Sequence, residues 1–210
     1  SFENSKHLSC GEGGAVTTND EDLAMLMRKM SNHGFKNSTA RSGLTKLNLD
    51  DFQNPDYKRH DTLGWNYRMP ELIAAVGLAQ FERIDELIEY RQKSAQFFID
   101  VMNKTDFLIP QRVPTGYTNS YYTLGVLYEG EEKYGVTWQD FRRLYLKEGG
   151  DGIYGAWSIP YLEPVIKDKK FFGRYPEAYS SLYYGPGLCP VAEKIQKRLM
   201  QFKTNYRNLD

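Results

Sequence analysis

Lys6 is the residue best suited, by its type and its setting, to chemistry in this chain. Small hydroxyl residues surround it, and a glycine-rich turn at residues 11–14 and a short apolar run at residues 15–18 follow it. A lysine is a nucleophile only when it has lost its proton, and desolvation shifts its pKa readily. Small neighbours leave room for a large group beside Lys6. The alternative is an ordinary solvated lysine ahead of an ordinary hairpin or loop.

The glycine-rich turn matches neither of the two familiar nucleotide-binding patterns. No Lys-Ser or Lys-Thr pair follows the sequence Gly-Glu-Gly-Gly of residues 11–14, and the third glycine of the dinucleotide pattern is missing. The histidines offer no metal site either. His7 adjoins Lys6 but is expected to point away from it, and His33 and His60 have no carboxylate or cysteine at metal-ligand spacing.

Two sequence blocks, in the right order and at the right distance, point to one protein family. Ser1-Phe2, then Lys6, then Gly-Glu-Gly-Gly at residues 11–14 resemble the lysine segment of the pyridoxal-phosphate-dependent sugar aminotransferases, the DegT/StrS family. The sequence Gly-Trp-Asn-Tyr-Arg-Met at residues 64–69, with the apolar helix sequence after it, is similar to a second block of that family. The resemblance covers nearly the whole chain, strongly to about residue 100 and more loosely beyond.

The resemblance implies a role for four residues. Lys6 matches the lysine that forms a Schiff base with pyridoxal phosphate and later moves a proton, and Ser1 matches the serine that binds the cofactor phosphate. Asn66 and Arg68 match the block that, in the family, reaches across a dimer interface toward the phosphate in the partner subunit. The alternatives are a turn-forming asparagine and an arginine that pairs with a surface acid.

The implied activity is transfer of an amino group from glutamate or glutamine to a nucleotide-linked keto sugar, in a homodimer. Dehydratases on the same scaffold are one alternative, but they commonly carry histidine in place of the lysine, so Lys6 counts against them. A fragment or assembly module without catalytic activity is the other alternative. The sequence names neither the sugar nor the position that is aminated.

The first block stands at the start of the chain, whereas members of the family carry a long upstream segment that forms most of the large domain. In the family, that segment holds the aspartate that pairs with the pyridine nitrogen and the residue that stacks on the cofactor ring. We therefore expect this chain to be a C-terminal portion that, by itself, binds pyridoxal phosphate weakly or not at all.

The resemblance also implies an α/β fold, the C-terminal part of a fold-type-I aminotransferase. Residues 1–69 are expected to be a remnant of the large cofactor-binding domain, residues 70–104 a linking helix region, and residues 105–210 a small α+β domain.

Hydrophobic spacing and capping residues predict the secondary structure. In the first half we expect a short buried strand at residues 14–18, a helix capped by Asn19 or Asp20 that stops near Gly34, a functional loop at 35–67, and one long helix or two joined helices from Pro70. In the second half we expect strands at residues 107–109 and 122–128, a helix at 137–148 and a closing helix at 190–202.

Aromatic residues gather in one region of the second half. Core and surface packing would explain them, but aromatic faces also stack on sugars and bases. We therefore assign Tyr154 and Trp157 to a candidate substrate site, although this segment lacks the histidine expected from the family. The aromatic residues of the region are Tyr154, Trp157, Tyr161, Phe171, Phe172, Tyr175, Tyr179, Tyr183 and Tyr184.

Composition limits the partners. The 210 residues carry 27 basic and 27 acidic side chains, so the basic surplus that nucleic acids require is missing. No apolar run approaches the length of a membrane span, and no signal peptide is recognised. Cys10 and Cys189 are too few and too far apart in sequence for a disulfide framework. A reduced, cytoplasmic setting is expected.

Overall fold

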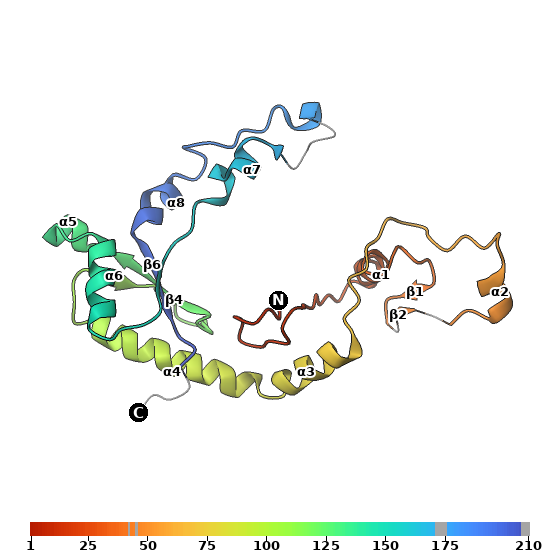
Figure 1. The fold of residues 1–210 in the computed structure, drawn as a ribbon, viewed down its shortest axis with the longest axis horizontal. Coiled ribbons are helices and arrows are strands. Elements are labelled where there is room, and N and C mark those ends of the chain that lie inside the picture. Colours follow the sequence, from red (N-terminus) through yellow and green to blue (C-terminus); the bar gives the residue numbers. More distant parts are fainter. Residues whose placement is uncertain (42, 45, 171–175, 207–210) are drawn as a thin grey trace. The chain divides into compact units, whose positions relative to one another are not determined.

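A computed structural model describes residues 1–41, 43–44, 46–170 and 176–206 (Figure 1). The chain divides into two compact units, residues 1–84 and residues 85–210. The boundary falls inside the region expected to link two domains.

Helix α1 (Glu21–Met30) is the first regular element of the first unit. Its cap is the expected one, because the side chain of Asp20 accepts the N–H of Leu23 at 2.9 Å. Beyond the end of the helix, Gly34 has a φ of 74° and donates its N–H to the carbonyl of Lys29 at 2.8 Å. The predicted N-terminal cap is therefore confirmed. The helix ends at Met30 with Ser31 as its C-cap, so it stops before Gly34, which takes the left-handed conformation three residues after that cap.

The predicted buried strand at residues 14–18 is wrong. This segment forms no strand, and the side chain of Val16 is 76% exposed. The apolar sequence of this segment suits a buried strand, but a strand also needs a neighbouring strand to bond with. Within the described part of the chain, no strand pairs with this segment.

The loop expected at residues 35–67 holds three short elements. Strands β1 (Ser38–Thr39) and β2 (Gly43–Leu44) pair antiparallel. Helix α2 (Leu49–Gln53) follows, and its cap Asn48 accepts the N–H of Asp51 at 2.7 Å. The rest of the loop is irregular, as its polar sequence predicts.

Two helices, not one, follow Pro70. Helix α3 (Glu71–Phe81) ends shortly before helix α4 (Ile84–Met102) begins. Helix α3 is apolar along nearly its whole length, and every residue in it is at least partly exposed. Helix α4 is amphipathic and buries one side, including Ala95 and Met102.

The second unit contains a four-stranded antiparallel sheet with the strand order β3-β4-β6-β5. In chain order the strands are β3 (Leu108–Pro110), β4 (Thr123–Tyr128), β5 (Ile153–Gly155) and β6 (Leu199–Lys203). Leu124 pairs with Phe202 across the two central strands. The strands predicted at residues 107–109 and 122–128 are therefore confirmed, with shifts of one residue.

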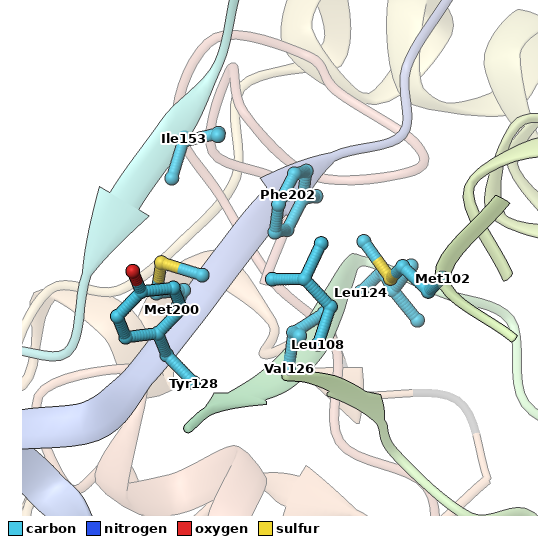
Figure 2. Packing of buried hydrophobic residues seen from close by; sticks show 8 residues of the cluster. All are labelled: Met102, Leu108, Leu124, Val126, Tyr128, Ile153, Met200 and Phe202. Carbon is cyan, nitrogen blue, oxygen red and sulfur yellow. The ribbon is translucent and has the colours of Figure 1, made fainter. Parts of the chain in front are cut away.

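Strands β4 and β6 alternate buried and half-buried residues, so one face of the sheet forms a core (Figure 2). Helix α4 packs on this face through Phe98 and Ile99, and helix α6 (Trp138–Lys147) packs on it through Phe141. The predicted cap of α6 is confirmed, because Thr137 accepts the N–H of Asp140 at 3.2 Å. The buried core residues are Met102, Leu108, Leu124, Val126, Tyr128, Ile153, Met200 and Phe202.

A buried cation ties α4 to the sheet. Arg91 is 7% exposed and donates to the carbonyl of Tyr122 at 2.8 Å and to Oγ1 of Thr204 at 3.4 Å. Burial lowers the pKa of Arg91. The ordinary pKa of an arginine side chain is so high that Arg91 stays charged.

The predicted closing helix at residues 190–202 is wrong in its second half. Helix α8 (Pro190–Ile195) and a short 3-10 turn (Gln196–Arg198) are followed by strand β6. Met200 and Phe202 are two residues apart, which is the spacing of residues on one face of a strand. Pairing with β4 makes this segment a strand and not the end of a helix. The remaining short elements are α5 (Gly130–Tyr134), η1 (Pro160–Leu162), α7 (Pro164–Lys167) and η3 (Pro176–Tyr179).

The second unit is thus a small α+β domain, and the mixed α/β class is confirmed. Among the described residues, no helix has both the length and the apolar character needed to cross a bilayer. Phe171, Phe172 and Tyr175 of the aromatic region lie outside the described residues.

Candidate active site

Lys6 lies in a closed loop at the start of the chain. The N–H of Phe2 donates to the carbonyl of Gly13 at 2.8 Å, and the N–H of Cys10 donates to the carbonyl of Phe2 at 3.0 Å. Inside this loop, the N–H of Lys6 bonds the carbonyl of Glu3 at 3.0 Å, which forms a tight turn. Lys6 is half-buried. The local sequence therefore holds the lysine on a short, fixed turn.

A carboxylate shares the turn with Lys6. Glu3 accepts the hydroxyl of Ser5 at 2.5 Å and the N–H of Ser5 at 3.1 Å. These hydrogen bonds, together with the positive charge of Lys6, hold the pKa of Glu3 below its ordinary value of 4.5. A negative charge is thus fixed beside the lysine at neutral pH.

Ser1 stands at the mouth of the same turn. Its Oγ accepts the N–H of Glu3 at 3.4 Å, and the residue is exposed. A hydroxyl that accepts one hydrogen bond still has its own hydrogen to donate. Ser1 can therefore donate to an anion that approaches the Lys6 turn.

The Lys6 loop packs against the second sequence block. A Cβ placed on Gly13 would lie 2.7 Å from Cε of Met69, and one placed on Gly77 of α3 would lie 3.8 Å from Cβ of Cys10. Cys10 itself is 5% exposed. The blocks at residues 1–14 and 64–69 therefore meet in one unit, although fifty positions separate Gly14 from Gly64, and α3 packs against the lysine loop.

Asn66 and Arg68 are positioned by the C-terminal end of α1. Asn66 forms an antiparallel bridge with Asn32, and Nη1 of Arg68 donates to Oδ1 of Asn32 at 2.5 Å. Between them, the N–H of Tyr67 bonds the carbonyl of Ser31 at 2.9 Å. Asn32 is 6% exposed, whereas Asn66 and Arg68 face solvent. This segment presents a neutral donor and a cation at the surface of the first unit.

A hollow with a volume of about 510 Å³ lies in the loop of residues 35–59. The sequence alone does not predict it. Its walls are aromatic and cationic: Phe35, Phe52 and Tyr57 line it together with Lys46 and Arg59. The guanidinium of Arg59 lies 5.5 Å from the ring centre of Tyr57, and the arginine also donates to the carbonyls of Phe52 and Tyr57. The one signal in the sequence was the length of the polar loop.

Tyr154 and Trp157 belong to the second unit. Tyr154 lies in β5, pairs with Gln201 and is 54% exposed. The side chain of Trp157 is 89% exposed, and its carbonyl accepts Nε2 of Gln196 at 2.9 Å. Both aromatic faces are open to solvent. Their assignment to a substrate site stays a prediction.

The histidines take structural contacts. Nδ1 of His60 lies 2.7 Å from the carbonyl of His33, and the ring of His60 stacks on Phe35 with centroids 4.8 Å apart. Among the residues that the structure describes, no group of three or more His, Cys, Asp or Glu side chains could hold a metal ion.

The residues around Lys6 fit two ends of pyridoxal phosphate. An amine on a fixed turn suits the aldehyde end, and the hydroxyl of Ser1 suits the phosphate end. Gly14 leaves the approach open, since among the described residues a Cβ there would meet only the Cα of Ser1, at 3.8 Å. The donor set is therefore compatible with this cofactor.

Comparisons with known proteins agree with this fit. A GDP-perosamine synthase of Caulobacter vibrioides is 36% identical over 94 residues, which are 44% of this chain and 20% of that protein. The structure of an aminotransferase from Psychrobacter cryohalolentis superposes with a TM-score of 0.74 at 24% identity, over 97% of this chain and 49% of that one. A GDP-4-keto-6-deoxy-D-mannose-3-dehydratase of E. coli with bound hydrated PLP gives a TM-score of 0.68 at 18% identity, over 97% and 49%.

The chain spans half or less of the length of these proteins. Their shared architecture confirms the expected mixed α/β fold of a fold-type-I aminotransferase, of which this chain spans about half. The model of the DegT/DnrJ/EryC1/StrS aminotransferase family matches residues 1–142. This match covers both the Lys6 loop and the block that holds Asn66 and Arg68, and the chain therefore belongs to the DegT/DnrJ/EryC1/StrS aminotransferase family.

Proposed function

We propose that this chain is the lysine-bearing part of a pyridoxal-phosphate-dependent aminotransferase that aminates a nucleotide-linked keto sugar. The observation that carries the proposal is Lys6, which lies on a hydrogen-bonded turn in a chain of this family. Glutamate or glutamine is the proposed amino donor.

Each residue of the turn has a separate task in this proposal. Pyridoxal phosphate, when bound, supplies the electron sink for the reaction. Lys6 would hold the cofactor through its aldehyde carbon and, once released, would carry a proton between the substrate carbon and that same cofactor carbon, which lies outside the ring. Ser1 donates its hydroxyl to the phosphate and thereby fixes the position of the ring relative to the lysine.

Asn66 and Arg68 are proposed to act on the phosphate in a partner subunit. The backbone bridge of Asn66 to Asn32 and the hydrogen bond of Arg68 to Asn32 hold both residues at the surface of the first unit. There, a neutral donor and a cation can reach a dianion on another chain. This proposal makes the active form a homodimer, because each site then needs residues from its neighbour. We further propose a cytoplasmic location.

The aromatic and cationic hollow supports the proposed class of substrate. Aromatic faces such as those of Phe52 and Tyr57 stack on nucleotide bases, and cations such as Lys46 and Arg59 offset phosphate charge. A nucleoside diphosphate sugar carries both a base and phosphates. We assign its nucleotide part to this hollow.

A dehydratase and a non-catalytic module are the two alternatives to this function. The similarity to a dehydratase makes removal of a sugar hydroxyl a candidate. The lysine at position 6 favours amino transfer, because the family resemblance implies that dehydratases of this scaffold commonly carry histidine there. A non-catalytic module is the other candidate. This candidate is favoured only if the lysine turn fails to bind the cofactor in a full-length enzyme that contains this chain. Because the chain spans half of its relatives, we propose that it binds pyridoxal phosphate weakly or not at all by itself.

The test compares Lys6→Arg with the unchanged sequence and with Lys167→Arg, an exposed lysine of the second unit. Each variant is assayed as a fusion protein of full length. The part of the Psychrobacter aminotransferase that this chain does not match is fused ahead of residue 1. The substrates are glutamate and GDP-, UDP- or dTDP-linked 4-keto sugars, and the product measured is 2-oxoglutarate. Amino transfer should be lost only in Lys6→Arg. Dehydration without amino transfer would favour the dehydratase.

A further inference from the structure

Glu3 takes part in four hydrogen bonds of the turn that carries Lys6. Its N–H donates to Oγ of Ser1 at 3.4 Å, and its carbonyl accepts the N–H of Lys6 at 3.0 Å. Its carboxylate accepts the hydroxyl of Ser5 at 2.5 Å and the N–H of Ser5 at 3.1 Å. One residue therefore connects the hydroxyl of Ser1, the residue that precedes the lysine and the main chain of the lysine itself.

The side chain of Glu3 folds back over the turn instead of extending into solvent. Each carboxylate oxygen has its own partner, because Oε1 accepts the N–H of Ser5 and Oε2 accepts its hydroxyl. Glu3 is half-buried as a result. Hydrogen bonds to an ionised carboxylate are stronger than those between neutral groups. The bonds from Ser5, that of the hydroxyl first, lower the pKa of Glu3, so the carboxylate is ionised at neutral pH.

The loop around this turn is fastened at its two ends. The N–H of Phe2 donates to the carbonyl of Gly13 at 2.8 Å, and the N–H of Cys10 donates to the carbonyl of Phe2 at 3.0 Å. These bonds fix where the loop begins and closes, but residues 3–9 lie between them. The hydrogen bonds of Glu3 lie within that stretch, at the tip that carries Lys6.

The chemistry proposed for Lys6 depends on where this tip lies. When Lys6 binds pyridoxal phosphate, the amine nitrogen bonds to the aldehyde carbon, and the aldehyde oxygen leaves as water with both amine hydrogens. Reacting atoms must be held about 3–3.5 Å apart and aligned, and a misplacement of about 1 Å can slow a reaction about a hundredfold. Ser1 is proposed to hold the phosphate end of the same molecule. The separation of Ser1 from Lys6 therefore has to stay constant.

We propose that Glu3 is a positioning residue for Lys6, whose carboxylate locks the turn through Ser5 and so keeps the lysine amine and the Ser1 hydroxyl at the separation that the cofactor requires. This proposal rests on the proposed function of Lys6. In it, Glu3 acts through Ser5 and the main chain and contacts neither cofactor nor substrate. Loss of the carboxylate should therefore slow the reactions of Lys6 without weakening the binding of the keto sugar.

Four variants separate this role from others. Glu3→Ala removes both acceptor oxygens, whereas Glu3→Gln keeps the length of the side chain and one acceptor oxygen. Ser5→Ala removes the hydroxyl partner. Glu12→Gln is the matched control, because Glu12 is an exposed glutamate of the same loop. Each variant is made in the chain itself and in the full-length fusion protein.

The first measurement uses the chain alone and no cofactor. Amide hydrogen exchange of Ser5 and Lys6 reports how firmly the turn is held, because both N–H groups are bonded to Glu3. Exchange of both amides should become about tenfold faster in Glu3→Ala and less so in Glu3→Gln. Glu12→Gln should exchange as the unchanged chain does. The free energy of unfolding, measured in urea, should stay the same in all of them.

The second measurement uses the fusion protein with pyridoxal phosphate, glutamate and the keto sugar. The rate at which the visible absorbance of lysine-bound cofactor appears, and kcat, should both fall about tenfold or more in Glu3→Ala. Both should fall less in Glu3→Gln, and KM for the keto sugar should not change in either variant. Adding Ser5→Ala to Glu3→Ala should cost less than the sum of the two single changes, because both break the same contact.

Unchanged exchange and unchanged rates in Glu3→Ala would overturn the proposal. Equal losses in Glu3→Gln and Glu3→Ala would also contradict it, because they would reduce Glu3 to a negative charge. A rise in KM at constant kcat, or an equal loss in Glu12→Gln, would count against it as well. If the unchanged fusion protein gave no lysine-bound cofactor, the proposed function would fail, and the exchange rates in the chain alone would still decide whether Glu3 holds the turn.

Discussion

Gly34 and Gly64 bring two backbone segments into direct contact at the end of α1. A Cβ on Gly64 would lie 2.2 Å from the backbone nitrogen of Gly34, and one on Gly34 would lie 1.9 Å from the carbonyl oxygen of Thr62. Both obstacles are main-chain atoms, which cannot rotate away as a flexible side chain can. The contact sets how the segment with Asn66 and Arg68 lies on α1.

Gly64→Ala should therefore destabilise the first unit by about 1–3 kcal/mol, because the added methyl group has to displace backbone. Urea unfolding followed by the fluorescence of Trp65 measures this loss. Gly77→Ala is the control. Its Cβ would meet Cys10 only at 3.8 Å, and alanine favours a helix over glycine by about 0.5–1 kcal/mol, so this variant should be neutral or more stable. Equal effects of the two variants would contradict the backbone contact.

Phe52→Ala should raise KM for the nucleotide sugar about tenfold in an assembled enzyme, because it removes a stacking face from the hollow at residues 35–59. Phe52 is 53% exposed, so folding should change little. Phe97→Ala, at 58% exposure on α4, is the matched control. An unchanged KM for Phe52→Ala would contradict the assignment of the nucleotide to this hollow.

Leu124→Ala should destabilise the second unit by about 2–5 kcal/mol. Leu124 is fully buried at the centre of the core in Figure 2, and the sheet around it cannot collapse into the space left behind. Leu144→Ala should lower the free energy of unfolding far less, because Leu144 is 56% exposed on α6. Chemical denaturation of both variants measures the difference in the free energy of unfolding.

Tyr161 and Glu193 form a pair whose contribution depends on pH. The hydroxyl of Tyr161 donates to the carboxylate of Glu193, which also accepts the N–H of Gly187 at 2.8 Å. These hydrogen bonds, that of Tyr161 first, lower the pKa of Glu193 below its ordinary value of 4.5. Partial burial and the bond to Glu193 raise the pKa of Tyr161 to about 12.

The lowered carboxyl pKa means that Glu193 stabilises this turn fully above pH 4.5 and loses that effect as the pH falls through its folded value. The raised phenol pKa means that Tyr161 contributes fully below pH 10 and loses its effect as the pH rises toward about 12. Thermal unfolding measured from neutral pH down to well below pH 4.5, compared with Glu193→Gln, should show a smaller acid dependence in the variant. Identical acid profiles would contradict the role of the pair.

Local signals predicted those elements whose cause is local. The caps at Asp20 and Thr137 are single side chains that bond to nearby N–H groups, so α1 and α6 could be recognised from sequence. Residues 199–203 could not be recognised as a strand from sequence, because the same apolar residues suit a helix or a strand. Pairing with β4 decides the outcome. Residues 14–18 show the converse, since a strand-like sequence forms no strand without a neighbour.

The candidate site divides in the same way. The lysine turn and the block at residues 64–69 are continuous in sequence, so their residues could be named before the fold was known. The hollow at residues 35–59 could not, because its aromatic and cationic walls are separated in sequence and meet only through loop contacts such as the hydrogen bonds of Arg59. The packing of Gly77 on Cys10 likewise follows from tertiary structure alone.

The central claim is that Lys6 holds pyridoxal phosphate. The most direct measurement treats the assembled enzyme with pyridoxal phosphate and sodium borohydride, which makes the bond between lysine and cofactor permanent, and then maps the label by peptide mass spectrometry. We predict one stoichiometric label on the peptide that contains Lys6, and none on that peptide in Lys6→Arg. A label spread evenly over other lysines, or retained in full by Lys6→Arg, would contradict the account.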